Sequence, residues 1–477
     1  MDALVTKLSS DSGARKAGAA GALLAIYLFM LYSRVFEATM LIGVPNIYLM
    51  LVLSVIALFA VIFKGGFVRA ARTPAGLLII AFTVWAAMIL PFSSWKSESL
   101  HELTDVWLKS ASAFFIIVGL TTAFAHSRKA FSAMGYGAAV SAVLLAATNH
   151  YYRDRVTSFG SLGNANEVAF HIAFGLPFLF LLISRVNVAY KVPLLAIALL
   201  SLALAVKTAS RAGLIITGAI VIVALLKVSF ANKFKIIALG AVAVIIGLLA
   251  AEQSQLERYK TIFGSSDSSA EALSAEESAA SRKHKLEQSI ALTLAHPLTG
   301  VGMGVFIPAA AELSKEQGET QDWLASHNSY TQISSETGIF GFLLIVGVFA
   351  LTLRSLLKLH RTAQRLKLKD VQSMALCMLL SSIALAIHFF FDAIAYEFYL
   401  PMVAGLSTSL VYAARPLIAE AESLPMSDTG TKSSEPLPVS AKQTFAPVAG
   451  EVEILTGNLY KFGRRRAPYK PPAVNIR

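Results

Sequence analysis

The chain has 477 residues, of which 56% are hydrophobic and only 15% are charged, and its mean hydropathy is +0.63. Soluble domains carry about a quarter charged residues, so this chain lacks the polar surface to cover itself in water. The composition therefore excludes an ordinary soluble enzyme. Gly and Pro occur at ordinary levels and the apolar residues come in blocks of membrane-spanning length, which excludes a disordered or collagen-like chain.

The formal net charge of +12 indicates membrane topology before it indicates a ligand. A basic soluble protein would suggest nucleic acid, but the cytoplasmic loops of membrane proteins collect Lys and Arg, which fix the orientation. We therefore expect membrane lipids, and no nucleic acid, around this chain. The single cysteine, Cys377, lies in an apolar segment. It excludes an intrachain disulfide, a Cys-based zinc site and an iron–sulfur cluster.

Apolar runs of roughly the length that spans a bilayer recur along the chain. They fall at 17–33, 46–63, 75–92, 108–125, 130–148, 167–184, 192–206, 212–229, 234–251, 337–353, 373–391 and 398–414. The first follows Arg15 and Lys16, as in a signal peptide, but no small-residue cleavage pattern comes after it, so we expect a retained helix. The sequence predicts an all-α, polytopic integral membrane protein with about twelve transmembrane helices.

The loops between these runs predict the orientation. With the N-terminus in the cytoplasm, alternation of the helices leaves most loop Lys and Arg inside. The predicted order is then a cytoplasmic N-terminus (1–16), helices one to nine (17–251), an external loop domain (252–336), helices ten to twelve (337–415) and a cytoplasmic tail (416–477). The tail is rich in Ser, Pro, Thr and Lys, which predicts disorder, and its basic end at Arg464–Arg466 suits anionic lipid.

The loop at 252–336 is the long connection of the membrane region, and long loops usually carry a function. Its stretch from Arg282 to His296 puts Leu286, Ile290 and Leu294 on one helical face before Pro297. We expect a small helical domain that rests on the membrane.

Basic residues on the predicted external side run against the orientation bias. They include Lys207 and Arg211 around a turn between two helices, and Arg258 and Arg282 in the loop. Arg binds anionic oxygen through a bidentate fork, which suits a phosphate or diphosphate at the end of a lipid tail. In the alternative interpretation, Arg211 and Lys207 are snorkelling anchors, and Arg258 and Arg282 lie on a solvated face.

His327, in Ser326-His-Asn-Ser-Tyr330, is the best candidate for proton transfer because an imidazole titrates near working pH and this one precedes a helix. The alternative is an ordinary polar loop residue. The glycines at 300, 302 and 304 lack the spacing and strand context of a dinucleotide fingerprint and predict a tight turn. The histidines and carboxylates show no metal-ligand spacing, so neither a metal nor another cofactor is expected. His388, Asp392 and Glu397 flank the last interhelical turn, where an ordinary loop role is expected.

Several segments together resemble the O-antigen ligase and O-antigen polymerase superfamily over about 160–345. They are Ser-Arg-Ala-Gly at 210–213, Arg258, Arg282, His-Pro-Leu-Thr-Gly-Val-Gly at 296–302, His-Asn-Ser-Tyr at 327–330 before Glu336-Thr-Gly338, and Gly163-Asn-Ala-Asn166-Glu167. The layout of helices with one large periplasmic loop is similar as well.

This resemblance implies transfer of a sugar chain from undecaprenyl diphosphate on the periplasmic side of the bacterial inner membrane, without nucleotide sugar or metal. It implies that His327 is the base on the acceptor hydroxyl and that Arg211 and Arg282 bind the diphosphate. Inversion of the anomeric centre is a further expectation from the family. The substrate-binding candidates are Arg258, Lys207, Asn328, Tyr330 and Asn166.

Three acceptors fit this resemblance. A ligase, our first choice, joins O-antigen to the lipid A core; a polymerase joins repeat units on the same carrier; a third variant transfers glycan to a protein such as a pilin. A transporter of lipid-linked glycan is a different class. Transporters typically carry charges near the membrane midplane, whereas the charges of this chain are predicted at one face. A purely structural scaffold is disfavoured by four separate external clusters in one region.

Overall fold

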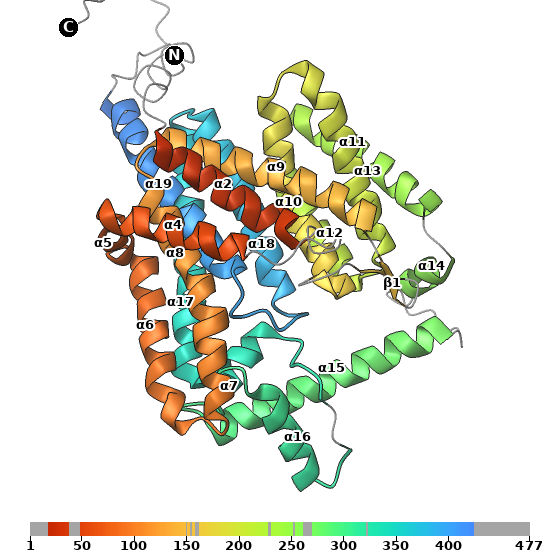
Figure 1. Ribbon diagram of the computed structural model, residues 1–477. Helices are drawn as coiled ribbons and strands as arrows, with labels where there is room; N and C mark the ends of the chain where they lie inside the picture. The colour runs from red at the N-terminus through yellow and green to blue at the C-terminus, as the bar shows by residue number, and fades with distance from the viewer. Residues whose placement is uncertain are drawn as a thin grey trace, which may run out of the picture. The chain divides into compact units, whose positions relative to one another are not determined.

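The computed structural model describes residues 18–37, 48–148, 150–152, 155–157, 162–227, 230–250, 253–260, 270–320 and 323–423. Regular structure in these ranges is helical (Figure 1), except for one antiparallel hairpin of β1 (His150–Tyr152) and β2 (Arg155–Thr157). The helical architecture agrees with the all-α prediction. The hairpin, whose Tyr, Val and Thr residues favour strands, is a local addition to it. The predicted N-terminus at 1–16 and residues 424–477 of the predicted tail lie outside the described residues.

Every predicted apolar run coincides, in its described part, with a helix. Within the described ranges, eight segments are long and apolar enough to cross a membrane. They are α6 with η2 (Pro74–Phe92), α7 with η3 and α8 (Lys96–Leu120), α9 (Phe124–Thr148), α10 (Ala165–Arg185), α11 (Val188–Lys207), α17 (Ser329–Arg365), α18 (Lys369–His388) and α19 (Tyr399–Ser423). The chain is thus a multi-pass helical membrane protein.

The remaining runs are also helical in their described parts. Their helices are α2 (Ala19–Ser33), α4 (Leu49–Phe63), α12 (Arg211–Lys227) and α13 (Phe230–Ala250), and the short α5 (Gly66–Ala71) follows α4. The total of twelve spans, the orientation and the domain boundaries stay predictions. Helix α19 runs to Ser423, past the predicted start of the tail at 416, because Ala and Glu residues favour helix and Arg365 Nη2 donates to Glu422 Oε1 at 2.8 Å.

The predicted loop domain is helical in its described part. It contains α14 (Gln253–Lys260), α15 (Ala270–Ala295) and α16 (Phe306–Glu316), and α17 begins at Ser329, before the predicted boundary. Helix α15 ends at Ala295, two residues before Pro297, in agreement with a helix that stops at this proline. On its apolar face the Ile290 and Leu294 side chains are 46% and 72% exposed. An exposed apolar face fits a helix that lies against lipid, which stays a prediction.

Close helix packing sets the positions of the functional segments. Helix α10 packs against α9, α11, α12 and α18, and α17 packs against α6, α15, α18 and α19. The approach of α12 to α10 depends on Gly213, since a Cβ there would lie 2.5 Å from Ala169 Cβ. Small residues allow such contacts between membrane helices. This contact fixes the start of α12, and with it Arg211, beside the start of α10.

Helix α17 is kinked at Gly338, whose φ of 72° and ψ of 178° are not helical. The Ile339 N–H donates to the Pro297 carbonyl at 2.9 Å, and Trp85 Nε1 of α6 donates to the Thr337 carbonyl at 2.9 Å. The kink leaves the Ile339 N–H without its helical partner, and the Pro297 carbonyl, outside α17, accepts from it instead. The kink lies next to the boundary that the sequence predicts between loop and membrane helix.

The segment 296–304 wraps around this kink. Gly300, Gly302 and Gly304 all have positive φ, of 67°, 117° and 75°, so the predicted tight turn is confirmed. The Val301 N–H donates to the Ser335 carbonyl at 2.8 Å, and Glu336 Oε1 accepts from the Phe306 N–H at the start of α16 at 3.1 Å. The turn therefore joins the end of α15, the start of α16 and the first part of α17 into one support for the residues before α17.

Candidate functional site

His327 lies at the junction between the loop domain and α17. Its φ is 51°, in the left-handed region, and the next residue, Asn328, is the N-cap of the helix. Among the described residues, the buried His327 Nδ1 has no hydrogen-bond partner. A strained backbone and an unsatisfied ring nitrogen are both typical of a functional position.

The connection between α18 and α19 packs onto the start of α17. The Ser329 N–H donates to the Phe389 carbonyl at 2.7 Å, and Ser329 Oγ donates to the Asp392 carbonyl at 2.7 Å. In return, Ser329 Oγ accepts from the Ile394 N–H at 3.0 Å. These bonds hold residues 389–394 next to His327, although the two segments are far apart in sequence.

Arg211 is the first residue of α12, directly after a tight turn from α11. Ala209 has a φ of 46°, and Ser210 caps the helix by accepting from the Gly213 N–H at 3.0 Å. The Ser210 hydroxyl also donates to Asn166 Oδ1 of α10 at 2.7 Å. The start of α12 is therefore fixed to the start of α10, and the backbone of Arg211 is held in one place.

Helix α15 brings two more cations to this region. Arg282 is partly buried, and Lys285, one turn later, is fully buried and donates to Gln288 Oε1 at 2.9 Å. Gln288 Nε2 donates in turn to Ser314 Oγ of α16 at 2.7 Å. The side of α15 opposite its exposed apolar face thus packs against the protein and carries positive charge.

Arg282 interacts electrostatically with Arg211, Asp392 and His327. Burial lowers its pKa, the Asp392 carboxyl raises that pKa, and the Arg211 guanidinium lowers it. The pKa of His327 is lowered by burial, and also by the positive charges of Arg282 and Lys285. The guanidinium on α15 therefore lies within electrostatic reach of the starts of α12 and α17 and of the α18–α19 connection. Arg211 and His327, which the sequence predicts to act with Arg282, are thus both within electrostatic reach of it.

Two acidic residues that the sequence assigned to an ordinary loop belong to the same region. Burial raises the pKa of Asp392 to about 6, while the Ala393 N–H and Arg282 oppose this shift. Burial also raises the pKa of Glu397 to about 8, as do the carboxyls of Glu167 and Asp392, and Arg34 opposes it. Buried carboxyls with shifted pKa values are candidates for function. The sequence signal for them was their position at a helix end.

His388, the last residue of α18, is a further residue that sequence reasoning set aside. It is 0% exposed, and its ring stacks on Phe170 of α10 with centroids 4.0 Å apart. His388 Nε2 lies 3.7 Å from Asp392 Oδ2. Neither of these atoms, nor His388 Nδ1, has a hydrogen-bond partner among the described residues.

The predicted substrate-binding residues are partly engaged in structural hydrogen bonds. Asn328 Oδ1 accepts from the Tyr330 and Thr331 N–H groups, and the Tyr330 hydroxyl donates to the Ala386 carbonyl at 3.0 Å. Asn166 Oδ1 accepts from Ser210 and, at 3.3 Å, from Arg155 Nη2. The structure gives these side chains roles in capping and joining helices.

The two remaining candidates lie near the α11–α12 turn. Lys207 is the last residue of α11. Arg258 belongs to α14, but its side chain lies outside the described part of the chain. The neighbouring Tyr259 hydroxyl donates to the Val206 carbonyl at 2.8 Å, which brings α14 to the end of α11. No group of three or more His, Cys, Asp or Glu side chains suited to a metal ion occurs in the described ranges.

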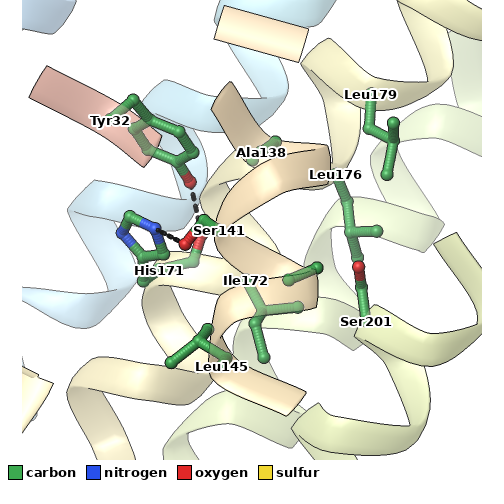
Figure 2. Close-up of a pocket in the computed structure, with 11 residues that line it drawn as sticks. Tyr32, Ala138, Ser141, Leu145, His171, Ile172, Leu176, Leu179 and Ser201 are labelled. Carbon is green, nitrogen blue, oxygen red and sulfur yellow. Dashed lines mark hydrogen bonds between the residues drawn. The ribbon is translucent and has the colours of Figure 1, made fainter. Parts of the chain in front are cut away.

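A network of polar side chains between α2, α9, α10 and α19 connects the helices next to this region. Figure 2 shows a pocket where Tyr32 and Ser141 point toward His171 of α10. Ser141 Oγ lies 2.8 Å from His171 Nε2, His171 Nδ1 lies 2.9 Å from the Tyr399 hydroxyl, and the Tyr32 hydroxyl donates to the His171 carbonyl. Helices α2, α9, α10 and α19 are thus joined where α19 begins, directly after Glu397.

Comparison with known proteins identifies the same part of the chain. Residues 196–346 match the family model described as O-antigen ligase. The match contains Arg211, Arg282, the turn at 296–304 and His327, and it excludes the Asn166 segment that the sequence resemblance included. No curated protein matches the chain. Residues 196–346 of this multi-pass membrane protein are therefore similar to the O-antigen ligase family, in agreement with the resemblance that the sequence motifs predict.

Proposed function

We propose that this protein transfers an O-antigen polysaccharide from undecaprenyl diphosphate to a sugar of the lipid A core. In this proposal the reaction takes place at the periplasmic face of the bacterial inner membrane. The orientation rests on the excess of Lys and Arg in the loops predicted to be cytoplasmic. With it, the starts of α12 and α17 and the α18–α19 connection all lie on the external side.

One observation carries the proposal. Arg282 lies within electrostatic reach of Arg211, His327 and Asp392, which come from separate elements. A cluster of two guanidinium groups and a lysine beside a neutral imidazole suits an anionic leaving group next to a hydroxyl nucleophile. Its position at the ends of apolar helices suits a carrier whose tail lies in lipid.

The guanidinium groups stabilise the departing diphosphate. In the transfer step, the bond between the sugar C1 and the diphosphate oxygen breaks, and the bonding electrons leave with the diphosphate. Arg211 and Arg282 bind its negative oxygens and supply the positive charge that the transition state needs. The diphosphate is a good leaving group, so the step requires charge stabilisation and a base.

His327 is the base in this proposal. Its lowered pKa keeps the imidazole neutral near neutral pH, and a neutral ring accepts the proton of the acceptor hydroxyl as the new bond to C1 forms. Attack on the face opposite the diphosphate inverts the anomeric centre. Once the diphosphate has left, the positive charges of Arg282 and Lys285 favour release of the proton from the ring to solvent.

The decisive experiment replaces His327 with Ala in a cell that assembles the lipid-linked glycan and has this protein as its ligase. Normal membrane abundance is checked first, and the surface polysaccharide is displayed on a gel. We expect uncapped lipopolysaccharide and long chains that stay on the carrier. His101→Ala is the matched control, since His101 is exposed and remote in sequence from these segments.

Two outcomes would change the assignment. Fully capped lipopolysaccharide in the His327→Ala cells would refute the role of His327, whereas single repeats on the lipid A core would indicate a polymerase. Arg211→Lys tests the diphosphate contact, because lysine keeps the charge but loses the bidentate fork. We expect a loss of transfer of at least tenfold, as roughly one charge-assisted hydrogen bond is lost. The control is Arg365→Lys, which changes an exposed ion pair with Glu422.

A further inference from the structure

His388 is buried with a packing partner for its ring but without hydrogen-bond partners for its nitrogens among the described residues. One face stacks on Phe170, with an angle of 5° between the rings. Both nitrogens are buried, and no described residue forms a hydrogen bond with them. Leaving a buried polar group unpartnered destabilises the folded state, so such a group usually has a purpose other than stability.

Asp392 is held beside this ring by the backbone. Its N–H donates to the His388 carbonyl at 3.1 Å, its Oδ1 accepts from the Ala393 N–H at 3.0 Å, and its carbonyl accepts from Ser329 Oγ. Asp392 Oδ2 has no partner in the described part of the chain and faces His388 Nε2 at 3.7 Å. A small rotation of either side chain would turn this contact into a hydrogen bond.

The charged groups around Asp392 come from several elements. Arg282 of α15 favours the ionised carboxylate, and the carboxyls of Glu167 on α10 and of Glu397 lie within electrostatic reach of Asp392. His327 lies next to it across the Ser329 bonds. Burial thus disfavours the ionised carboxylate and Arg282 favours it, so one additional hydrogen-bond donor would shift the balance towards the ionised form.

We propose that His388 is a positioning residue of the transfer site: its Nε2–H donates to Asp392 Oδ2 and holds this carboxylate against one edge of the Arg282 guanidinium. A guanidinium has five N–H donors in a rigid plane, so a carboxylate bound to one edge fixes the direction of the donors on the other edge. The free edge of Arg282 is then directed at the diphosphate. This inference rests on the proposed function of Arg282.

The pH dependence has a defined sign. Asp392 must be ionised to orient Arg282, and burial raises its pKa to about 6. Affinity for the diphosphate donor is therefore expected to weaken as pH falls through about 6. Removing the His388 donor raises the pKa of Asp392 further, which moves this loss of affinity to higher pH.

The test uses the full-length protein in nanodiscs, with undecaprenyl diphosphate as the probe for binding and a lipid-linked glycan for transfer. His388→Phe keeps the stacking on Phe170 and removes the donor, and His388→Gln keeps an N–H donor. We expect the Phe variant to raise the Kd and the donor KM about tenfold at pH 6, with little change of kcat. At pH 8 the effect should be smaller, and the Gln variant should stay near the wild type.

The controls separate this inference from the proposed function. His360→Phe makes the same change at a buried histidine near the other end of α17 and should leave binding unchanged. If Arg282→Ala leaves binding intact, the proposed function fails. If Arg282→Ala abolishes binding but His388→Phe keeps the wild-type pH profile, the role of His388 is refuted. It is refuted as well if the Phe and Gln variants are impaired equally at all pH values, or if wild-type affinity rises as pH falls.

Discussion

Replacing Gly338 with Ala should disrupt the support of the candidate site without touching any residue of the site itself. Gly338 has a backbone conformation that is essentially restricted to glycine. A Cβ at this position would lie 2.0 Å from the Leu298 carbonyl oxygen and 2.5 Å from its carbon. Both contacts are with backbone, which cannot move aside as a flexible side chain could.

The cost can be worked out from these contacts. Holding a non-glycine residue in such a conformation costs about 1–3 kcal/mol. Relief of the clash would separate residues 297–298 from the kink and break the bond between the Ile339 N–H and the Pro297 carbonyl, which contributes about 1 kcal/mol. The expected total is about 2–4 kcal/mol. Because the turn at 296–304 also anchors α16, the loss should reach the segment that carries His327.

The measurement is the apparent melting temperature of the purified protein in nanodiscs, together with glycan transfer in cells. Gly218→Ala is the matched control, since Gly218 lies in α12 with open space around its Cβ position, and Ala there should stabilise the helix by about 0.5–1 kcal/mol. We expect a clear decrease of the melting temperature and weak transfer for Gly338→Ala alone. Equal melting temperatures and full transfer in both variants would refute the reasoning.

Two further predictions concern single side chains. Ser210→Ala removes the cap of α12 and the hydrogen bond to Asn166. It should lower the free energy of unfolding by about 1–2 kcal/mol and reduce transfer by displacing Arg211. Ser373→Ala, at an exposed position, is the control in the same melting assay, and a Ser210→Ala protein with unchanged melting temperature and transfer would contradict this prediction. Glu397 has a folded-state pKa of about 8, above its unfolded value, so the folded protein binds more protons there and stability falls as pH rises from about 5 to 8. Glu397→Gln should reduce this fall in melting temperature, and a variant with the wild-type pH dependence would show that Glu397 is not its source.

The sequence by itself determined the membrane class and the helices. In hydrocarbon every backbone N–H and C=O must find a partner within the segment, so an apolar run of sufficient length has to be helical. Helical periodicity located α15 from the spacing of Leu286 and Ile290, and the glycines at 300, 302 and 304 predicted the tight turn. The resemblance at Arg211, Arg282 and His327 indicated the residues that the tertiary structure brings together.

Only the tertiary structure decided which contacts the polar side chains make. Asn328 and Tyr330 stand beside His327 in sequence, yet one caps α17 and the other bonds to α18. His388 and Asp392 read as ordinary loop residues, yet they lie buried beside Arg282. The reason is that burial and hydrogen-bond partners depend on contacts between helices remote in sequence, and the apolar pattern that fixes each helix carries no information about its partners.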